Sequence, residues 1–137
     1  MIVTGILLKS DDIRIVTLSG TRENHNRIAD RIHKLQLPIS TTQDDITVFV
    51  QTLRAFCSDN QVDLACINQR NHTGKHAGGA ATFRNEGIIF ASLSIPVRLV
   101  HPSTMAATER RQSALKTSRP EARELGTAYD LAFEGLE

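Results

Sequence analysis

The sequence has few aromatic residues, few cysteines and no long apolar run. Tryptophan is absent, and aromatic residues make up 4% of the chain. That scarcity argues against a platform on which the bases of a single strand would stack. The only cysteines are Cys57 and Cys66, and without a secretion signal we expect buried reduced thiols rather than a disulfide. No apolar run reaches the roughly 20 residues that cross a membrane.

The N-terminus and the charge balance exclude further classes of protein. The first ten residues, MIVTGILLKS, have no basic lead and no cleavage-like site. They therefore predict a strand rather than a targeting segment, and we expect a cytoplasmic protein. A net charge of +1 gives no global attraction to nucleic acid or to a membrane. Twelve of the sixteen basic residues are arginine, the type preferred for forked contacts to phosphate or carboxylate, which favours a recognition surface.

At 137 residues the chain fits a single domain, 1–137, with room for a real core. Its first third predicts three strands. The apolar run 2–8 is typical of a central strand covered on both faces. A polar turn separates it from the β-branched run 13–18, so the two predict a hairpin. A third strand is expected over 28–37, ending at Pro38.

The remainder predicts helices alternating with strands. Thr42 and Asp45 form a capping box, after which apolar residues recur at helical spacing: Ile46, Phe49, Val50, Leu53, Phe56 and Cys57. The later elements are expected as a strand at 62–67, a helix at about 78–93, a strand at 97–100, a short helix capped by Ser103 or Thr104, a polar and basic stretch at 110–120 that we expect to be mobile, and an amphipathic helix from Ala122 to Leu136. The order β-β-β-α-β-α-β-α-α predicts an α/β fold, a five-stranded mixed sheet with helices on both faces.

This order resembles the ribonuclease H-like fold, and most closely its RuvC/YqgF-type branch. TGILLKSDDIRIVTLSG resembles the opening hairpin, VDLACINQR the fourth strand, IPVRLVHPSTMAAT the fifth strand and its turn, and GTAYDLAFEGL the last helix. GKHAGGAATFRNEG resembles the hallmark of a small, uncharacterised bacterial family of this fold, whose members carry a similar Gly-Lys-x-Ala-Gly-Gly segment. The resemblance covers nearly the whole chain.

The resemblance implies a nuclease site that this chain lacks. Nucleases of this fold hold two divalent metals with carboxylates from the first strand, the fourth strand and the last helix, and the metals activate a water and stabilise the leaving oxygen. The matching positions here carry no acid: Leu7 on the first strand, Asn68 and Gln69 on the fourth, and Gly126 and Thr127 on the last helix. Amide oxygens lack the charge that makes binding of a hard cation tight.

Some carboxylates remain near these positions. Asp130 is one helical turn after Gly126, and Glu134 shares its face, so these two form the residual acidic site if the protein is a nuclease. Acids displaced from elsewhere are the other candidates: Asp11, Asp12, Glu86 and Glu109. We expect no catalytic residue, no metal site and no cofactor, with Mg²⁺ or Mn²⁺ required only under this nuclease alternative.

The stretch NQRNHTGKHAGGAATFRNEG, 68–87, suggests three kinds of site. His72 and His76 have a zinc-compatible spacing, but no third ligand lies nearby in the sequence. The spacing of a phosphate-binding P-loop is absent. The paired glycines at a helix start favour close packing on the sheet, although a helix start also attracts anions. We interpret the stretch as a contact surface whose partner-binding candidates are Arg70, His72, Lys75, His76 and Arg84.

A second basic segment, ERRQSALKTSR, supplies Arg110, Arg111, Lys116 and Arg119. These side chains suit phosphates or an acidic protein surface. A solvated connector is an equally good interpretation.

Three hypotheses follow. The first is a non-catalytic interaction protein on a degenerate ribonuclease H-like scaffold, which binds a protein or nucleoprotein partner and is suited to a mobile-element-encoded inhibitor of a host nucleic-acid-targeting or defence complex. The second is a metal-dependent nuclease or resolvase that uses displaced acids. The third is a nucleic-acid binder without cleavage, acting through its arginines. None involves a membrane, and the sequence leaves the oligomeric state open.

Overall fold

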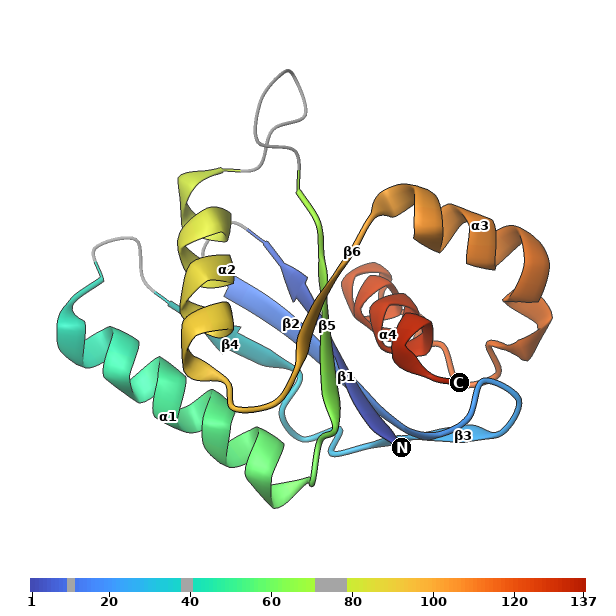
Figure 1. Cartoon of the computed structure of the whole chain (residues 1–137), viewed down its shortest axis with the longest axis horizontal. Coiled ribbons are helices and arrows are strands. Elements are labelled where there is room, and N and C mark those ends of the chain that lie inside the picture. Colours follow the sequence, from blue (N-terminus) through green and yellow to red (C-terminus); the bar gives the residue numbers. More distant parts are fainter. Residues whose placement is uncertain (10–11, 38–40, 71–78) are drawn as a thin grey trace.

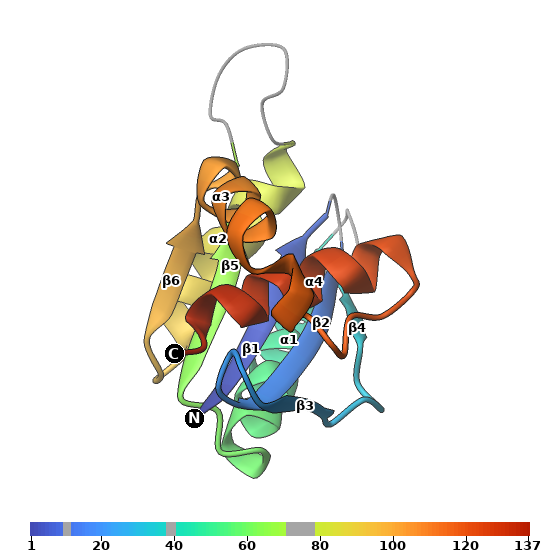
Figure 2. The same cartoon turned by 90° about the vertical axis from the view of Figure 1, so that its right-hand side faces the viewer.

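The computed structural model describes residues 1–9, 12–37, 41–70 and 79–137. It is a mixed sheet with α1 and α2 on one face and α4 on the other, where α3 lies beside α4 (Figures 1 and 2). The elements are β1 Ile2–Leu8, β2 Asp12–Gly20, β3 His25–Ile28, β4 Lys34–Gln36, α1 Gln43–Asp59, β5 Leu64–Asn68, α2 Ala80–Ser92, β6 Val97–Val100, α3 Pro102–Gln112, the 3₁₀ helix η1 Ser113–Leu115 and α4 Arg123–Gly135.

The sheet has the strand order β3-β2-β1-β5-β6, with β4 also paired to β2. β1 is antiparallel to β2 and parallel to β5, and β5 is parallel to β6. The predicted mixed sheet with helices on both faces is confirmed. The predicted third strand, 28–37, is instead two short strands on β2, because Ala29 between them has a φ of 57°. A residue in that left-handed region interrupts a ladder, so the sheet has six strands in the described chain.

The first core lies between the sheet and the helices α1 and α2. The capping box is confirmed, since the Asp45 N–H donates to Thr42 Oγ1 and the Thr42 N–H donates to Asp45 Oδ2, both at 3.2 Å. The apolar face of α1 packs on alternate residues of β1 and β2, which gives a buried cluster that includes Ile6, Leu8, Ile13, Ile15, Phe49, Leu53, Phe56, Ile67 and Ile89.

The second core lies under α4, which is almost entirely buried. Ala128, Tyr129, Leu131, Ala132 and Phe133 are all 0% exposed. α4 lies directly on β1, because a Cβ on Gly5 would be 1.9 Å from the Ala128 carbonyl oxygen. The last helix was therefore predicted correctly, and Gly5 is what allows its backbone to approach the strand.

The region between α2 and α4 departs from prediction in two places. The strand at 97–100 is confirmed, but the cap of α3 is His101 rather than Ser103 or Thr104, because its Nδ1 accepts the Ser103 N–H at 3.0 Å. Pro102 then occupies the first helical position, where its missing N–H costs nothing. The polar and basic stretch 110–120 was expected to be mobile and was assigned no helix, yet α3 extends to Gln112 and η1 follows it.

Both cysteines are free and buried, as predicted. Burial raises the pKa of the Cys57 and Cys66 thiols to about 11, so neither is a thiolate nucleophile near neutral pH. Within the described ranges, no helix is long and apolar enough to cross a membrane.

Candidate functional site

The first turn of α4 lies over the carboxyl end of β1. Glu124, in that turn, forms an ion pair with Lys9, which directly follows β1. At the other end of the helix, Gly135 packs on Val3, near the start of β1. α4 is therefore antiparallel to β1, and its first turn meets the strand end where the family resemblance places metal-binding carboxylates.

Leu7 and Asn68 are neighbours at this end of the sheet. The parallel register pairs Ile6 with Ile67, so the next residues of β1 and β5 lie side by side. The Leu7 side chain packs against the second core, and Asn68 Oδ1 accepts the Leu8 N–H at 2.8 Å. Leu7 offers no ligand atom, and part of the acceptor capacity of Asn68 is already used to join the two strands.

Five charged side chains surround this strand end, and we refer to Lys9, Asp12, Arg14, Lys34 and Glu124 as the Lys9 cluster. Arg14, which pairs with Leu7 across the hairpin, forms an ion pair in which its Nη1 is 2.8 Å from Glu124 Oε2. Arg14 Nε is 3.5 Å from Asp12 Oδ1, and Lys34 Nζ is 3.8 Å from Asp12 Oδ2. This end of the sheet therefore carries ion pairs, whereas the family resemblance implies carboxylates that are free to bind metal ions.

The surroundings of Glu124 favour the ionised form of its carboxylate. The hydrogen bond from Lys9 lowers the pKa of Glu124, loss of hydration opposes this, and the charges of Arg14, Lys9 and Lys34 lower it further. Glu124 also sits at the start of a helix whose N-cap residue, Ala122, provides no side-chain cap. A negative charge is favoured there by the helix dipole and by the unpaired N–H groups of the first turn.

Gly126 faces a different neighbour. A Cβ at this position would lie 2.8 Å from the Arg119 Cζ, so the glycine leaves room for that guanidinium against the helix. Glu124, and not Gly126, is the residue of this first turn that contacts the segment following β1.

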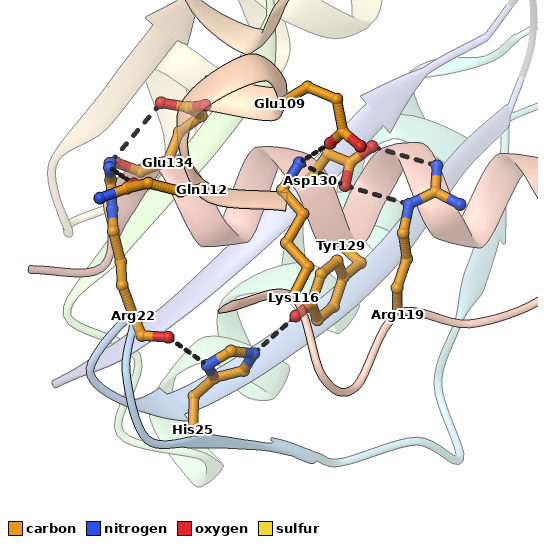
Figure 3. A network of polar contacts seen from close by, with 9 residues as sticks. All are labelled: Arg22, His25, Glu109, Gln112, Lys116, Arg119, Tyr129, Asp130 and Glu134. Atoms are coloured by element: carbon orange, nitrogen blue, oxygen red, sulfur yellow. Dashed lines mark hydrogen bonds and ion pairs between the residues drawn. The ribbon is translucent and has the colours of Figure 1, made fainter. Parts of the chain in front are cut away.

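Asp130 fastens the segment after η1 to α4 (Figure 3). Its Oδ1 accepts from Lys116 Nζ at 3.0 Å and from Arg119 Nε at 3.1 Å, while Oδ2 accepts from Arg119 Nη2 at 3.1 Å. Lys116 also pairs with Glu109 at 2.6 Å, and its side chain is only 4% exposed. Asp130 is therefore a buried clamp in this structure, with both oxygens in use.

Glu134 belongs to a second clamp at the carboxyl end of α4 (Figure 3). Arg22 donates to the main-chain oxygens of Glu134 and Leu136 at 3.0 and 2.8 Å, and to Gln112 Oε1 at 2.7 Å. The Glu134 carboxylate is 3.6 Å from the same guanidinium. Asp130 and Glu134 are about 9 and 15 Å along the helix axis from Glu124, by the helical rise, and each contacts its own basic partner.

His25 is buried beneath the same helix. Its Nδ1 lies 3.1 Å from the carbonyl oxygens of Thr21 and Arg22, which only accept hydrogen bonds, so Nδ1 carries the proton. Nε2 then accepts from the Tyr129 hydroxyl at 2.6 Å. The imidazole is thus a satisfied structural group that joins the β2–β3 turn to α4.

The predicted partner-binding residues are scattered over the structure. Arg110 and Arg111 are exposed at the end of α3, and Arg70 is partly buried after β5. Arg84 lies on α2, a helix of the opposite layer, and its Nε is 3.4 Å from Asn85 Oδ1. Lys116 and Arg119 are bound to Asp130, as described above. His72, Lys75 and His76 lie outside the described residues, and the contact role of this whole set stays a prediction.

The displaced acids do not assemble into a metal site in the described part of the chain. No group of three or more histidine, cysteine, aspartate or glutamate side chains is arranged there to hold a metal ion. Asp12 and Glu109 are paired with cations, Glu86 lies on α2 in the other layer, and Asp11 is outside the described residues. A leucine, an amide and two carboxylates that are both paired with cations do not fit the two-metal chemistry of the nuclease alternative.

The comparisons with known proteins identify the family. A family model with the description "Protein of unknown function (DUF3010)" matches residues 1–135. The chain belongs to this family. No curated protein matches the sequence.

Solved structures share the fold at low sequence identity. RuvC of T. thermophilus in complex with a Holliday junction substrate has a TM-score of 0.72 at 9% identity, over 97% of this chain and 90% of that one. A second Thermus thermophilus RuvC structure has a TM-score of 0.70 at 10% identity, over 97% and 92%. The Fowlpox virus resolvase with Holliday junction DNA has a TM-score of 0.57 at 8% identity, over 98% and 96%. This chain therefore shares the RuvC-type ribonuclease H-like fold, as the sequence predicted.

Sequence reasoning missed the residues that form the site. Lys9, Arg14 and Glu124 were not among the candidates, and neither were the anchoring residues Arg22 and His25. Two signals were present. The hairpin of β1 and β2 places Arg14 opposite Leu7, and the helical period places Glu124 one turn before Ala128, on the face that meets β1.

Proposed function

We propose that this protein is a non-catalytic interaction protein that binds a nucleoprotein partner through its RuvC-type scaffold. The observation that carries the proposal is the Lys9 cluster, in which Lys9 and Arg14 pair with Glu124 at the strand end where nucleases of this fold hold metal ions. The positive charges of Lys9 and Arg14 oppose the binding of a divalent cation beside them, since like charges repel. A scaffold of this kind acts by binding alone.

The nature of the partner is supported by the shared fold. Two proteins of similar fold are solved with Holliday junction DNA, and arginine predominates among the basic residues here. Both observations favour a partner that contains nucleic acid. The finer hypothesis, an inhibitor of a host nucleic-acid-targeting or defence complex, is supported only by the small size of the chain and by the paired state of its acids.

The nuclease alternative retains one favourable observation, because Asp12 and Glu124 are carboxylates at the right strand end. A cleavage assay separates the two functions. Purified protein is incubated with branched DNA, RNA–DNA hybrid and single strands, with Mg²⁺ or Mn²⁺. We expect no product at any protein concentration. Cleavage that disappears in Asp12→Asn, Glu124→Gln or Asp130→Asn would establish the nuclease and exclude the non-catalytic proposal.

The partner itself is sought by affinity capture from the native host, followed by mass spectrometry. One half of the lysate is treated with nuclease before capture. A nucleoprotein partner is captured from the untreated half and is reduced in the treated half. Capture that is equal in both halves indicates a partner recognised through protein alone.

A further inference from the structure

The Lys9–Arg14–Glu124 trio is accessible from solvent. The side chains of Lys9, Arg14 and Glu124 are 39%, 21% and 35% exposed. Lys9 follows β1 and Arg14 lies on β2, so the two cations come from the two strands of one hairpin and are fixed by the sheet. Glu124 alone comes from another element. The hairpin thus sets the backbone positions of both cations, and Asp12 holds the Arg14 side chain in addition.

The charge balance of the cluster is positive even with Glu124 in place. Lys9, Arg14 and Lys34 carry three positive charges, while Asp12 and Glu124 carry two negative charges, which leaves +1. Asp12 is 15% exposed and holds Arg14 and Lys34 from the β2 side. It therefore orients Arg14 without covering the side that Glu124 contacts.

The position that Glu124 fills has the chemistry of an oxyanion site. One guanidinium nitrogen of Arg14 and the Lys9 ammonium contact its carboxylate, and Glu124 itself lies in the first turn of a helix without a side-chain cap. These are the groups that bind a phosphate: arginine through paired N–H donors, lysine as a point charge, and free main-chain N–H groups of the first turn. A backbone phosphate presents one negative charge on two non-bridging oxygens, as the carboxylate does.

We propose that Lys9 and Arg14 bind a backbone phosphate of a nucleic acid in the place where related folds hold metal ions, and that Glu124 occupies this position as a built-in competitor in the free protein. The inference rests on the proposed function and names the ligand of the same site. Arg123, exposed directly before Glu124 in the first turn of α4, adds another positive charge. The cluster contains no aromatic residue, so the contact is with the backbone and does not depend on base sequence.

The test measures binding of fluorescently labelled DNA, as a duplex and as a four-way junction, by anisotropy over a series of salt concentrations in EDTA. Glu124→Gln keeps the shape of the side chain and removes its charge. We expect it to bind DNA roughly two- to fivefold more tightly than wild type, the size of one exposed ion pair. The matched control is Glu121→Gln, an exposed acid three residues earlier, which is expected to change affinity much less.

The converse variant is Lys9→Gln combined with Arg14→Gln. It weakens binding and makes the slope of log K against log salt less steep by about 1, because one neutralised phosphate contributes about 1. Arg110→Gln combined with Arg111→Gln removes the same charge from the exposed end of α3 and leaves most of that slope. A folding defect lowers affinity, so the gain in Glu124→Gln cannot come from misfolding.

Competitors identify the source of the phosphate. Unlabelled DNA is expected to displace the probe, whereas inorganic phosphate and a phosphoserine peptide at the same phosphate concentration are not. The proposal is overturned if the Glu124 and Lys9–Arg14 variants bind DNA like wild type, or if the peptide binds at Lys9 and Arg14 in preference to DNA. Cleavage of the DNA with Mg²⁺ would overturn the proposed function instead. If a nucleoprotein is captured but these variants leave the DNA affinity unchanged, this inference alone is overturned.

Discussion

The two ends of α4 carry acids of the same kind in very different settings. Glu124, in the first turn, is half-exposed and meets cations from a separate hairpin. Asp130 and Glu134, farther along, are 14% and 6% exposed at their side chains and fasten the segments that flank the helix. The difference teaches that burial and partners, not residue type, separate an exchangeable charge from a structural one.

The largest expected effect comes from disturbing the close contact between the α4 backbone and Gly5 of β1, on which the position of the whole helix depends. Gly5→Ala places a Cβ 1.9 Å from the Ala128 carbonyl oxygen and 2.5 Å from the Ala132 nitrogen. Both neighbours are main-chain atoms, so α4 must shift, and we expect a loss of about 3 kcal/mol or more in the free energy of unfolding. Chemical denaturation followed by circular dichroism measures it.

The control for this variant is Gly87→Ala in α2, where a Cβ meets nothing within 4 Å. It should gain about 0.5–1 kcal/mol, as alanine does over glycine in a helix. Equal stabilities for the two variants would mean that the α4 backbone does not contact β1 at Gly5.

The next effect separates the two ends directly. Asp130→Asn leaves the buried Lys116 with Glu109 alone and weakens the fork from Arg119. We expect it to cost about 2–3 kcal/mol, toward the lower end for a buried pair that loses one partner. Glu124→Gln should cost much less, because its partners remain hydrated. Asp59→Asn, an exposed acid at the end of α1, controls for the change in net charge, and a Glu124 variant as unstable as the Asp130 variant would remove the distinction.

These two acids also show how far sequence reasoning reaches. The hairpin, the Thr42 capping box and the amphipathic C-terminal helix were predictable because each is encoded by neighbours in sequence. The absence of acids at positions 7 and 68, where the chain has Leu7 and Asn68, could be predicted once the fold was assigned. The pairing of Lys9 with Glu124 was not, since 115 residues separate them and the contact exists only after α4 settles on β1.

Burial produced the other misjudgements. Lys116 belongs to the same basic stretch as Arg110 and Arg111, yet its side chain is 4% exposed whereas the two arginines are exposed. Likewise, an alanine gives no sign of the positive φ that divides the third strand at Ala29. Both outcomes depend on tertiary contacts, which override local pattern.

A smaller effect probes the clamped end alone. Tyr129→Phe removes the hydroxyl that donates to His25 Nε2 at 2.6 Å, and it leaves that buried nitrogen without a donor. We expect a loss of about 1–2 kcal/mol in the free energy of unfolding. The affinity for DNA should not change, because the pair lies beneath the middle of α4. Phe133→Leu, in the same core, is the packing control, and a DNA affinity that falls with Tyr129→Phe would link the two ends.

The smallest effect is the dependence of stability on pH at the exposed end. The pKa of Glu124 is lower in the folded protein than in the unfolded chain, chiefly because of Lys9. The unfolded chain therefore takes up this proton first as the pH falls. The stability that Glu124 contributes is present above the unfolded pKa and is lost as the pH falls through the folded pKa.

Wild type and Glu124→Gln should accordingly differ most at neutral pH and converge in acid, when urea unfolding of the two is compared from pH 7 to pH 3. The Glu121→Gln variant controls for the loss of one negative charge at an exposed position close to the same helix start. A difference between wild type and Glu124→Gln that stays constant to pH 3 would mean that Lys9 and Arg14 do not hold this carboxylate in solution. Glu124 would then not occupy the proposed phosphate position in the free protein.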